Sequence, residues 1–507
     1  MSKKRANINI GAFLAHMRLL GAPLSQERSI DMALSLEPQA VFSFFEEISA
    51  IPRGSGNEAA IAAHMISWAS ARNLFAERDS ANNVFIKKAA SPGKENHPPI
   101  LLQAHLDMVC EKTPESAHDF QSDPISIQVR DGYLVADGTT LGADNGIGVS
   151  LIMAVLDDPN AEHPPLEVLF TAGEEAGMTG ARQLSSSGWA FESKTLINLD
   201  SGWEGVFIAG AAGGGRTVFR IPIERESNAD PCFRIDVRGL LGGHSGAEIH
   251  LGRANANQVL ARVLNNLTAE WRLISMGGGG KDNAIARNAY AVLSCADISA
   301  LHSQIAQQND ALRREYESVD PELEICITSS EPEALRMTSA STACVKQFLI
   351  LLPNGVLARD HAMDFTVTSM NIGSCRVEND CLAVRCSVRS TIPAHLTSWL
   401  LPQLRILAGL CSAELEEADF YPGWEFRRAS PIRTLAMEAY QAVTGSPASF
   451  KILHGGLECG ILMEQLGFTD AISYGPELND PHSPRENLSI TSVGTADKLI
   501  RRILKAL

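Results

Sequence analysis

Acidic and histidine side chains directly follow apolar runs at several points of this sequence. His105 and Asp107 end a run that starts at Pro99, and the alternation of a β-strand puts both side chains on one face. The other candidates follow further apolar runs or lie in glycine- or proline-rich turns: Asp144, Glu174, Glu175, Asp200 and His482. Open α/β sheets bind ligands at the carboxyl ends of their strands. The pattern therefore predicts that these groups converge on one site.

Carboxylates that converge in this way need a compensating charge, because uncompensated like charges raise one another's pKa and destabilise the fold. A pair of divalent cations removes the conflict, and mixed imidazole and carboxylate ligands suit zinc or a similar borderline metal. Two ions about 3.5–4 Å apart, bridged by one carboxylate, would use most of these groups. Each motif alone has an ordinary structural explanation, such as a surface pair, a solvated face or a helix N-cap. Only the ordered set indicates a metal centre.

The elements that must position these groups alternate between strand and helix. Apolar runs predict strands over 99–103, 166–171 and 195–199, and helices over 37–50 and 146–156. This alternation favours an α/β catalytic domain in which helices flank a mixed sheet.

The chain changes character at the glycine run 211–215. Beyond it we expect a strand over 233–237, a helix over 255–267, a glycine-rich loop over 277–280 and a helix over 306–318. These elements predict an inserted α+β domain, a lid or dimerisation domain, that interrupts the catalytic domain. The expected division is an N-terminal extension over 1–34, the catalytic domain over 35–212 and 423–507, and the inserted domain over 213–422.

Composition excludes several classes of protein. The 507 residues carry 43 Lys and Arg against 59 Asp and Glu, a net charge of −16, which does not suit a nucleic-acid backbone. No apolar run reaches the length of about 18 residues that a membrane span needs. The 10 cysteines include no C-x-x-C pair, so we expect reduced thiols and a cytoplasmic location. The basic N-terminus lacks a cleavage site and is interpreted as an extension.

The motifs resemble those of the di-zinc aminoacylase and carboxypeptidase-G superfamily of metallopeptidases. In detail the chain resembles the bacterial aminoacyl-histidine dipeptidase branch, also called peptidase D or Xaa-His dipeptidase. The matching stretches are 103–109 (QAHLDMV), 141–146 (LGADNG), 171–175 (TAGEE), 198–200 (NLD), 243–246 (GHSG) and 454–460 (HGGLECG), with looser matches over 283–287 and 475–483. The resemblance covers nearly everything after residue 36.

The resemblance implies two divalent metal ions, zinc in the first place and manganese or cobalt as alternatives. One ion would be held by His105 and Asp200, the other by Glu175 and His482, and Asp144 would bridge them.

The resemblance also implies catalytic roles and a backbone feature. Asp107 would orient His105 through its second ring nitrogen. Glu174 would act as general base towards a metal-activated water and then as general acid towards the leaving amine. The family commonly has a cis peptide bond after the bridging aspartate, here between Asp144 and Asn145.

Four residues are implied to act on the substrate. His244, in the inserted domain, would reach the site when the domains approach and stabilise the oxyanion; the alternative is that the stretch 242–246 is only a glycine-rich turn after a strand. Asn283, Arg287 and His454 are candidate substrate-binding residues, with the arginine facing a carboxylate. For each of these three, a structural role is an equal alternative. The chain has Ala286 where the family often has proline, which leaves the substrate preference open.

The resemblance thus implies a metal-dependent dipeptidase that acts on Xaa-His substrates of the carnosine type. An N-acyl amino acid amidohydrolase with the same metal site is the nearer alternative, and a catalytically silent peptide-binding relative is the more distant one. The expected partners are a small peptide substrate and a second copy of the chain in a homodimer, with no nucleic acid and no membrane.

Overall fold

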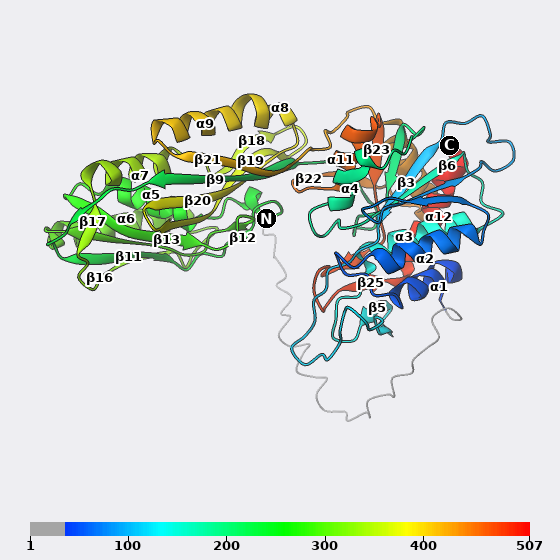
Figure 1. The fold of residues 1–507 in the computed structure, drawn as a ribbon, viewed down its shortest axis with the longest axis horizontal. Coiled ribbons are helices and arrows are strands. Elements are labelled where there is room, and N and C mark those ends of the chain that lie inside the picture. Colours follow the sequence, from blue (N-terminus) through cyan, green and yellow to red (C-terminus); the bar gives the residue numbers. More distant parts are fainter. Residues whose placement is uncertain (1–35) are drawn as a thin grey trace, which may run out of the picture.

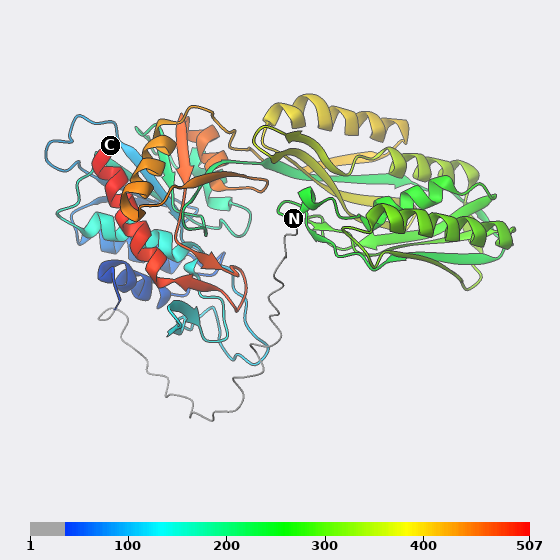
Figure 2. The same ribbon diagram turned by 180° about the vertical axis from the view of Figure 1, so that it is seen from behind.

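The computed structural model describes residues 36–507, so the predicted N-terminal extension over 1–34 lies outside the described residues. The described chain forms two bodies, each built on its own large sheet (Figures 1 and 2). No helix within residues 36–507 is long and apolar enough to cross a membrane. All ten cysteines have free thiols.

The first body contains an eight-stranded mixed sheet with parallel strands at its centre. β3 pairs in parallel with β6 and with β7, and all residues of β3 and β6 are buried, as expected for strands covered on both faces. The strand order is β1 (Phe75–Arg78), β2 (Val84–Lys88), β6 (Leu166–Thr171), β3 (Ile100–His105), β7 (Thr195–Asn198), β23 (Asp470–Ser473), β8 (Val206–Ala211) and β22 (Ser449–Leu453). The expected α/β class, a mixed sheet flanked by helices, is confirmed.

Helices cover both faces of this sheet. Successive side chains of a strand point to opposite faces of the sheet, so Leu102 of β3 packs in the apolar core on one face and its neighbour Leu101 packs in the core on the other. The larger core holds α1 (Gln39–Ser49), α2 (Ala59–Ser70), α3 (Ala143–Asp157), α10 (Pro431–Thr444) and α12 (Ile490–Ala506). The smaller core holds α4 (Thr179–Gln183) and α11 (Glu458–Leu466). A four-stranded sheet of β4 (Ile127–Arg130), β5 (Tyr133–Ala136), β24 (Leu478–Asn479) and β25 (Asn487–Ser489) lies beside them.

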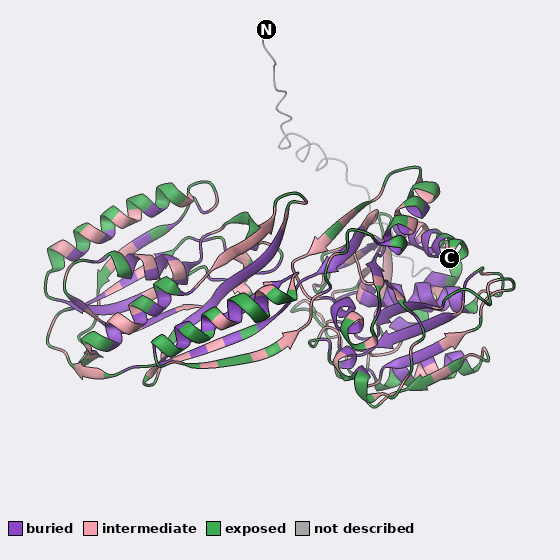
Figure 3. Cartoon of the chain, turned by 90° about the horizontal axis from the view of Figure 1, so that it is seen from above, coloured by how far each residue is buried: buried purple, intermediate pink, exposed green. Residues whose placement is uncertain are grey.

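The second body is a nine-stranded antiparallel sheet with its own buried core (Figure 3). Its main path is β16 (Glu324–Ser329), β11 (Cys232–Arg238), β15 (Ala289–Cys295), β13 (Trp271–Gly279), β19 (Phe365–Glu378), β20 (Cys381–Ser390), β9 (Gly213–Pro222) and β21 (Glu414–Tyr421), and β18 (Gly355–Asp360) pairs with β19. The helices packed into this core are α5 (Ala256–Asn266), α6 (Ile298–Tyr316), α7 (Ser339–Leu351) and α9 (Leu401–Leu410). Shorter elements complete the body: β10 (Arg225–Ser227) with β17 (Leu335–Met337), β12 (Gly243–His244) with β14 (Ala284–Ile285), and α8 (Pro393–His395).

The chain passes from the first sheet to the second between β8 and β9 and returns after β21. Ala211 pairs with Trp424 where the two crossings run side by side. That the second body acts as a lid or dimerisation domain stays a prediction.

Glycine-rich segments form strands here. The prediction of a loop over 277–280 is wrong, because β13 runs through Gly279. A side chain on Gly277 would meet the ring of Tyr290 at 2.8 Å, so the ring occupies the space that a side chain would need. Gly215 in β9 lies in the same way under the ring of Phe420, where a Cβ atom would approach to 2.5 Å.

Candidate metal centre

Three neighbouring strands of the first sheet deliver acidic and histidine side chains to one edge. His105 is the last residue of β3, Glu174 and Glu175 follow β6, and Asp200 follows β7. Asp144 lies at the start of α3, where its dihedral angles depart from those of a helix, and its peptide bond to Asn145 is cis. These positions are the carboxyl ends of parallel strands, as the sequence predicts.

Three of these groups form a first triad, which we call site 1. Nε2 of His105 lies 3.1 Å from Oδ1 of Asp144 and 3.6 Å from Oδ1 of Asp200. His105 is 1% exposed, so its ring is fixed by packing. Asn145 donates from Nδ2 to Oδ1 of Asp200 at 2.6 Å and to the carbonyl oxygen of Leu199. Site 1 is therefore a set of donors whose orientations are fixed before any ligand binds.

A second triad, site 2, shares Asp144 with the first. Nε2 of His482, in the segment between β24 and β25, lies 2.8 Å from Oε1 of Glu175 and 3.1 Å from Oδ2 of Asp144. The two oxygens of Asp144 thus face different imidazoles. In each triad, one donor atom per residue lies within 4.8 Å of the others, which is compact enough for one ion.

The pKa shifts of the side chains in the two triads show how strongly their charges interact. Hydrogen bonds with Asp144 and Glu175 raise the pKa of His482 to about 10. Burial lowers the pKa of His105, but neighbouring carboxylates, Asp200 first among them, outweigh burial and raise the pKa well above its usual value. The pKa of Asp144 is lowered despite burial, because both imidazoles hydrogen-bond to it. The raised imidazole pKa values and the lowered pKa of Asp144 indicate that opposite charge stabilises this cluster, and a pair of divalent cations would supply positive charge to the same nitrogen and oxygen donors.

Asp107 lies behind His105, on the side away from the triads. Its Oδ1 is 3.4 Å from Nδ1 of His105 and accepts the backbone N–H of Glu174 at 3.0 Å, while Oδ2 accepts from Ser55 and from the N–H of Glu175. Burial opposes ionisation, but the hydrogen bonds, led by that with His105, lower the pKa of Asp107 to about 2. The carboxylate is therefore an anion that joins the His105 ring to the turn after β6.

Glu174 differs from its neighbour Glu175 in its surroundings. Burial raises the pKa of Glu174 well above its usual value; the charge of His105 opposes this, and the negative charges of Asp200, Glu458 and Glu175 add to it. Burial also raises the pKa of Glu175, but there a hydrogen bond with His482 opposes the effect. One of its oxygens lies within 4.8 Å of donor atoms of His105 and Glu175, so it borders the donors without belonging to site 1 or site 2. A carboxyl group that binds a proton readily beside a metal centre is suited to proton transfer.

Sequence reasoning missed two supporting groups. The sequence analysis singles out Asn145 only through its peptide bond, but its side chain also donates to Asp200. Glu458 is fully buried and accepts from Gln103 at 2.6 Å and Thr171 at 2.7 Å, beneath the triads. Burial raises the pKa of Glu458 to about 7. Glu458 lies within the stretch 454–460 that carries the family resemblance, but a glutamate at the start of an apolar helix has no distinctive spacing.

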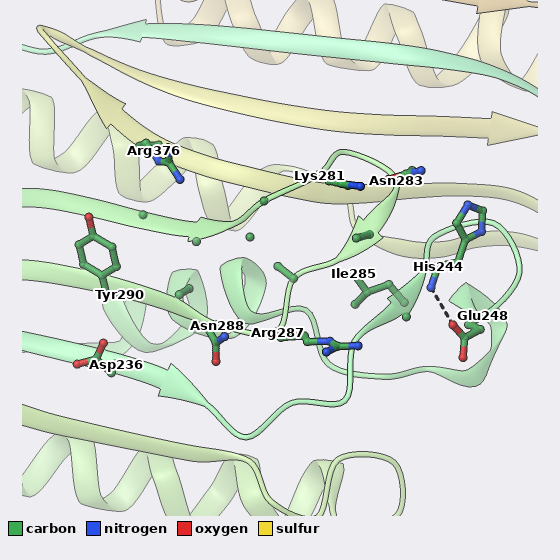
Figure 4. Close-up of a pocket in the computed structure, with 18 of the residues that line it drawn as sticks. Asp236, His244, Glu248, Lys281, Asn283, Ile285, Arg287, Asn288, Tyr290 and Arg376 are labelled. Atoms are coloured by element: carbon green, nitrogen blue, oxygen red, sulfur yellow. Dashed lines mark hydrogen bonds between the residues drawn. The ribbon is translucent and has the colours of Figure 1, made fainter. Parts of the chain in front are cut away.

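The second body holds three of the predicted substrate-contacting residues in one pocket (Figure 4). His244, Asn283 and Arg287 line a cavity of about 850 Å³ that no residue of sites 1 and 2 lines. Nδ1 of His244 accepts the backbone N–H groups of Gly246 and Ala247 at 3.2 and 3.1 Å. The ring proton therefore sits on Nε2, which leaves that nitrogen as a hydrogen-bond donor. His244 does not contact the triads in this arrangement of the two bodies.

His454 does not line this pocket, but its carbonyl oxygen and the ring of His244 both lie against Gly246, where a Cβ atom would approach them to 2.8 and 3.0 Å. It follows β22 of the first body, and its Nε2 lies 2.7 Å from Oγ of Ser369 in β19 of the second body. Burial, with the charge of Arg389, lowers the pKa of His454 to about 3, so the ring is neutral. His454 thus joins the two bodies, and it also borders a separate cavity of about 480 Å³ with Gly246 and Ala247.

Comparison with known proteins identifies the class to which this fold and site belong. The model of peptidase family M20/M25/M40 matches residues 101–506, a stretch that contains every residue of sites 1 and 2. The chain belongs to this family and is a metallopeptidase. It is 37% identical over 477 residues to the cytosol non-specific dipeptidase of Escherichia coli K12, a match that covers 93% of this chain and 98% of that protein.

Solved structures show the same relationship. The aminoacylhistidine dipeptidase of Vibrio alginolyticus superposes with a TM-score of 0.88 at 34% identity, covering 94% of this chain and 98% of that one. Aminopeptidase PepT from Bacillus cereus shares the fold at a TM-score of 0.54 and 15% identity.

Proposed function

We propose that this protein hydrolyses dipeptides with a pair of divalent cations bound at sites 1 and 2, and that Xaa-His dipeptides are among its substrates. The observation that carries the proposal is the shared carboxylate of Asp144, whose two oxygens face His105 and His482 separately. The names of the Escherichia coli and Vibrio alginolyticus relatives support a dipeptide substrate, and the second name supports the Xaa-His preference.

The ligands in this proposal are His105, Asp144 and Asp200 at site 1, and Asp144, Glu175 and His482 at site 2. Zinc suits these nitrogen and oxygen donors, and manganese or cobalt can occupy similar sites. When bound, the ions polarise the scissile carbonyl group and make water acidic enough to be deprotonated near neutral pH.

Glu174 is the proposed general base. Its carboxylate accepts a proton from the attacking water and passes it to the nitrogen of the leaving amino acid, so the group ends each cycle as it began. The raised pKa of Glu174 favours the proton-holding form that this second step requires. Asp107 contributes by holding both the ring of His105 and the backbone of Glu174 and Glu175.

The pocket of the second body is the proposed contact for the far end of the substrate. Arg287 and Asn283 would bind the C-terminal carboxylate, for which a guanidinium group offers two parallel donors. His244 would donate from Nε2 to the oxyanion once the second body approaches the first. Apposition of the two bodies also excludes water from the reacting atoms.

An N-acyl amino acid amidohydrolase is the alternative, because the same centre and the same carboxylate contact would serve that substrate. A catalytically silent relative is disfavoured, since all five ligands and Glu174 are present and close together.

The test is a substrate panel on metal-depleted protein reloaded with Zn²⁺, Mn²⁺ or Co²⁺. The panel compares carnosine, Ala-His and Ala-Ala with N-acetyl amino acids and a tripeptide. We expect hydrolysis of the dipeptides in a metal-dependent manner. Hydrolysis of the N-acetyl amino acids alone would assign the amidohydrolase activity instead.

A further inference from the structure

Two buried charged residues, Arg53 and Glu486, both form hydrogen bonds with the backbone of the loop that carries Asp144. Each is 2% exposed, although neither is a ligand of site 1 or site 2. Arg53 precedes α2, and Glu486 lies four residues after His482. Burying a charge is costly unless hydrogen bonds or an opposite charge compensate it. The hydrogen bonds of Arg53 and Glu486 therefore show what these buried charges stabilise.

The guanidinium group of Arg53 joins two ligand-bearing segments. Nη1 donates to the carbonyl oxygens of Leu106 and Asp107 at 2.9 and 3.2 Å, and Nη2 donates to that of Gly142 at 2.5 Å. The first two carbonyls lie one and two residues after His105, and the third lies two residues before Asp144. One side chain thus fixes the end of β3 against the start of α3.

The glycines of the 141–146 stretch make room for this guanidinium. A Cβ atom on Gly142 would lie 2.8 Å from Nη2 of Arg53, and one on Gly146 would lie 2.5 Å from it. Gly142 also has a φ of 69°, in the left-handed region that favours glycine. The glycines of this stretch therefore serve two purposes: they leave space for the guanidinium group of Arg53, and they allow the backbone conformation of the turn.

Glu486 holds the same loop through its backbone N–H groups. Its Oε2 accepts from Leu141 and Gly142 at 2.8 and 3.0 Å, and its Oε1 accepts from Asp144 at 3.1 Å. Because Glu486 follows His482 closely, these three bonds tie the His482 segment to the bridging aspartate. Gly142 is thus held at both of its backbone polar groups, because its carbonyl oxygen accepts from Arg53 and its N–H donates to Glu486.

We propose that Arg53 and Glu486 are positioning residues that set the spacing of His105, Asp144 and His482 and thereby the affinity of the metal pair. The inference rests on the proposed metal centre and adds two residues to it. An arginine is required because its planar fork reaches carbonyls on two segments at once, whereas a lysine offers one compact donor group. A carboxylate is required because all three of its partners are donors.

The test compares metal binding in Arg53→Lys, Arg53→Met, Glu486→Gln and the double variant Arg53→Lys/Glu486→Gln. Matched controls come from buried charges that hold backbone groups elsewhere. Arg433→Met removes a guanidinium that binds the carbonyls of Arg427 and Arg428, and Glu167→Gln alters a carboxylate that accepts the N–H groups of Glu192 and Ser193. Titration of metal-depleted protein with Zn²⁺ gives the affinity, and the visible absorption of bound Co²⁺ reports the ligand geometry.

We expect the Arg53 and Glu486 variants to bind Zn²⁺ roughly 10–100-fold more weakly, the range for loss of a group that orients a ligand. Arg53→Lys should lose less than Arg53→Met, and the double variant should lose less than the product of the single losses, because both residues act on one loop. The controls should lower the melting temperature while keeping metal affinity and the Co²⁺ spectrum.

The outcomes separate the positioning role of Arg53 and Glu486 from the proposed metal centre itself. Folded Arg53→Lys and Glu486→Gln proteins with unchanged affinity and spectrum would refute the positioning role, and circular dichroism identifies folded protein. If Arg53→Met does not fold, the two conservative variants still carry the comparison. A lack of metal uptake by the unaltered chain would instead refute the proposed metal centre.

Discussion

Nε2 of His482 lies 3.1 Å from Oδ2 of Asp144, although 338 residues separate the two in the sequence. The whole second body intervenes between them along the chain. Site 2 is therefore complete only when the chain has returned from the second sheet and the segment between β24 and β25 has packed against the start of α3. This dependence links metal binding to the folding of the first body as a unit.

Metal binding should release protons. The pKa of His482 is raised to about 10 by its hydrogen bonds with Asp144 and Glu175, so in metal-free protein the imidazole is protonated near neutral pH. A cation must displace that proton, and the apparent affinity should rise by up to about tenfold per pH unit for each proton displaced. Calorimetry at pH 7 in two buffers of different ionisation enthalpy measures the release. Equal heats in both buffers would contradict it.

The same proton affects the stability of the metal-free protein. Because the folded pKa of His482 lies above its ordinary value of 6.5, the ion pair with Asp144 and Glu175 contributes fully below that value. The contribution is lost as the pH rises through about 10. Metal-free protein should therefore show a falling melting temperature over this range, and His482→Ala should flatten the fall.

Glu174 and Glu175 should respond differently to the same substitution. Glu174→Gln keeps the shape of the side chain but cannot accept a proton, so it should retain both metals and lose activity by roughly 10²–10⁴-fold. Glu175→Gln removes a donor from site 2, so added metal should restore part of its rate. Metal analysis after gel filtration, together with kcat at several metal concentrations, separates the two effects. Loss of metal from Glu174→Gln with retention in Glu175→Gln would reverse the assignment.

His244→Ala should lower kcat while leaving metal content unchanged, because His244 belongs to the second body and to neither triad. His302→Ala is the matched control, since it removes an exposed histidine in α6 of the same body that borders neither the pocket of His244 nor that of His454. We expect the control to keep the unaltered kcat. An unchanged kcat in His244→Ala would remove this residue from the mechanism.

The strand ends that carry the site could be predicted because they lie where an apolar run stops. β6 spans Leu166–Thr171, the predicted range, since a strand buried on both faces has a continuous apolar pattern. The strands of the second sheet were harder to predict from the sequence. Glycines in β9 and β13 leave room for neighbouring aromatic rings, but in the sequence alone such glycines suggest loops. Arg53 and Glu486 could not be found at all. Their partners are backbone atoms, which have no side-chain pattern to detect.

The most direct test of the central claim is a titration of metal-depleted protein with Zn²⁺ while the hydrolysis of a dipeptide such as carnosine or Ala-Ala is followed. The account predicts negligible activity without metal, a rise with added Zn²⁺ and a plateau at two equivalents per chain. Asp144→Asn should bind neither ion normally, since both sites share this carboxylate. Full dipeptide hydrolysis by protein that holds only trace metal would contradict the account.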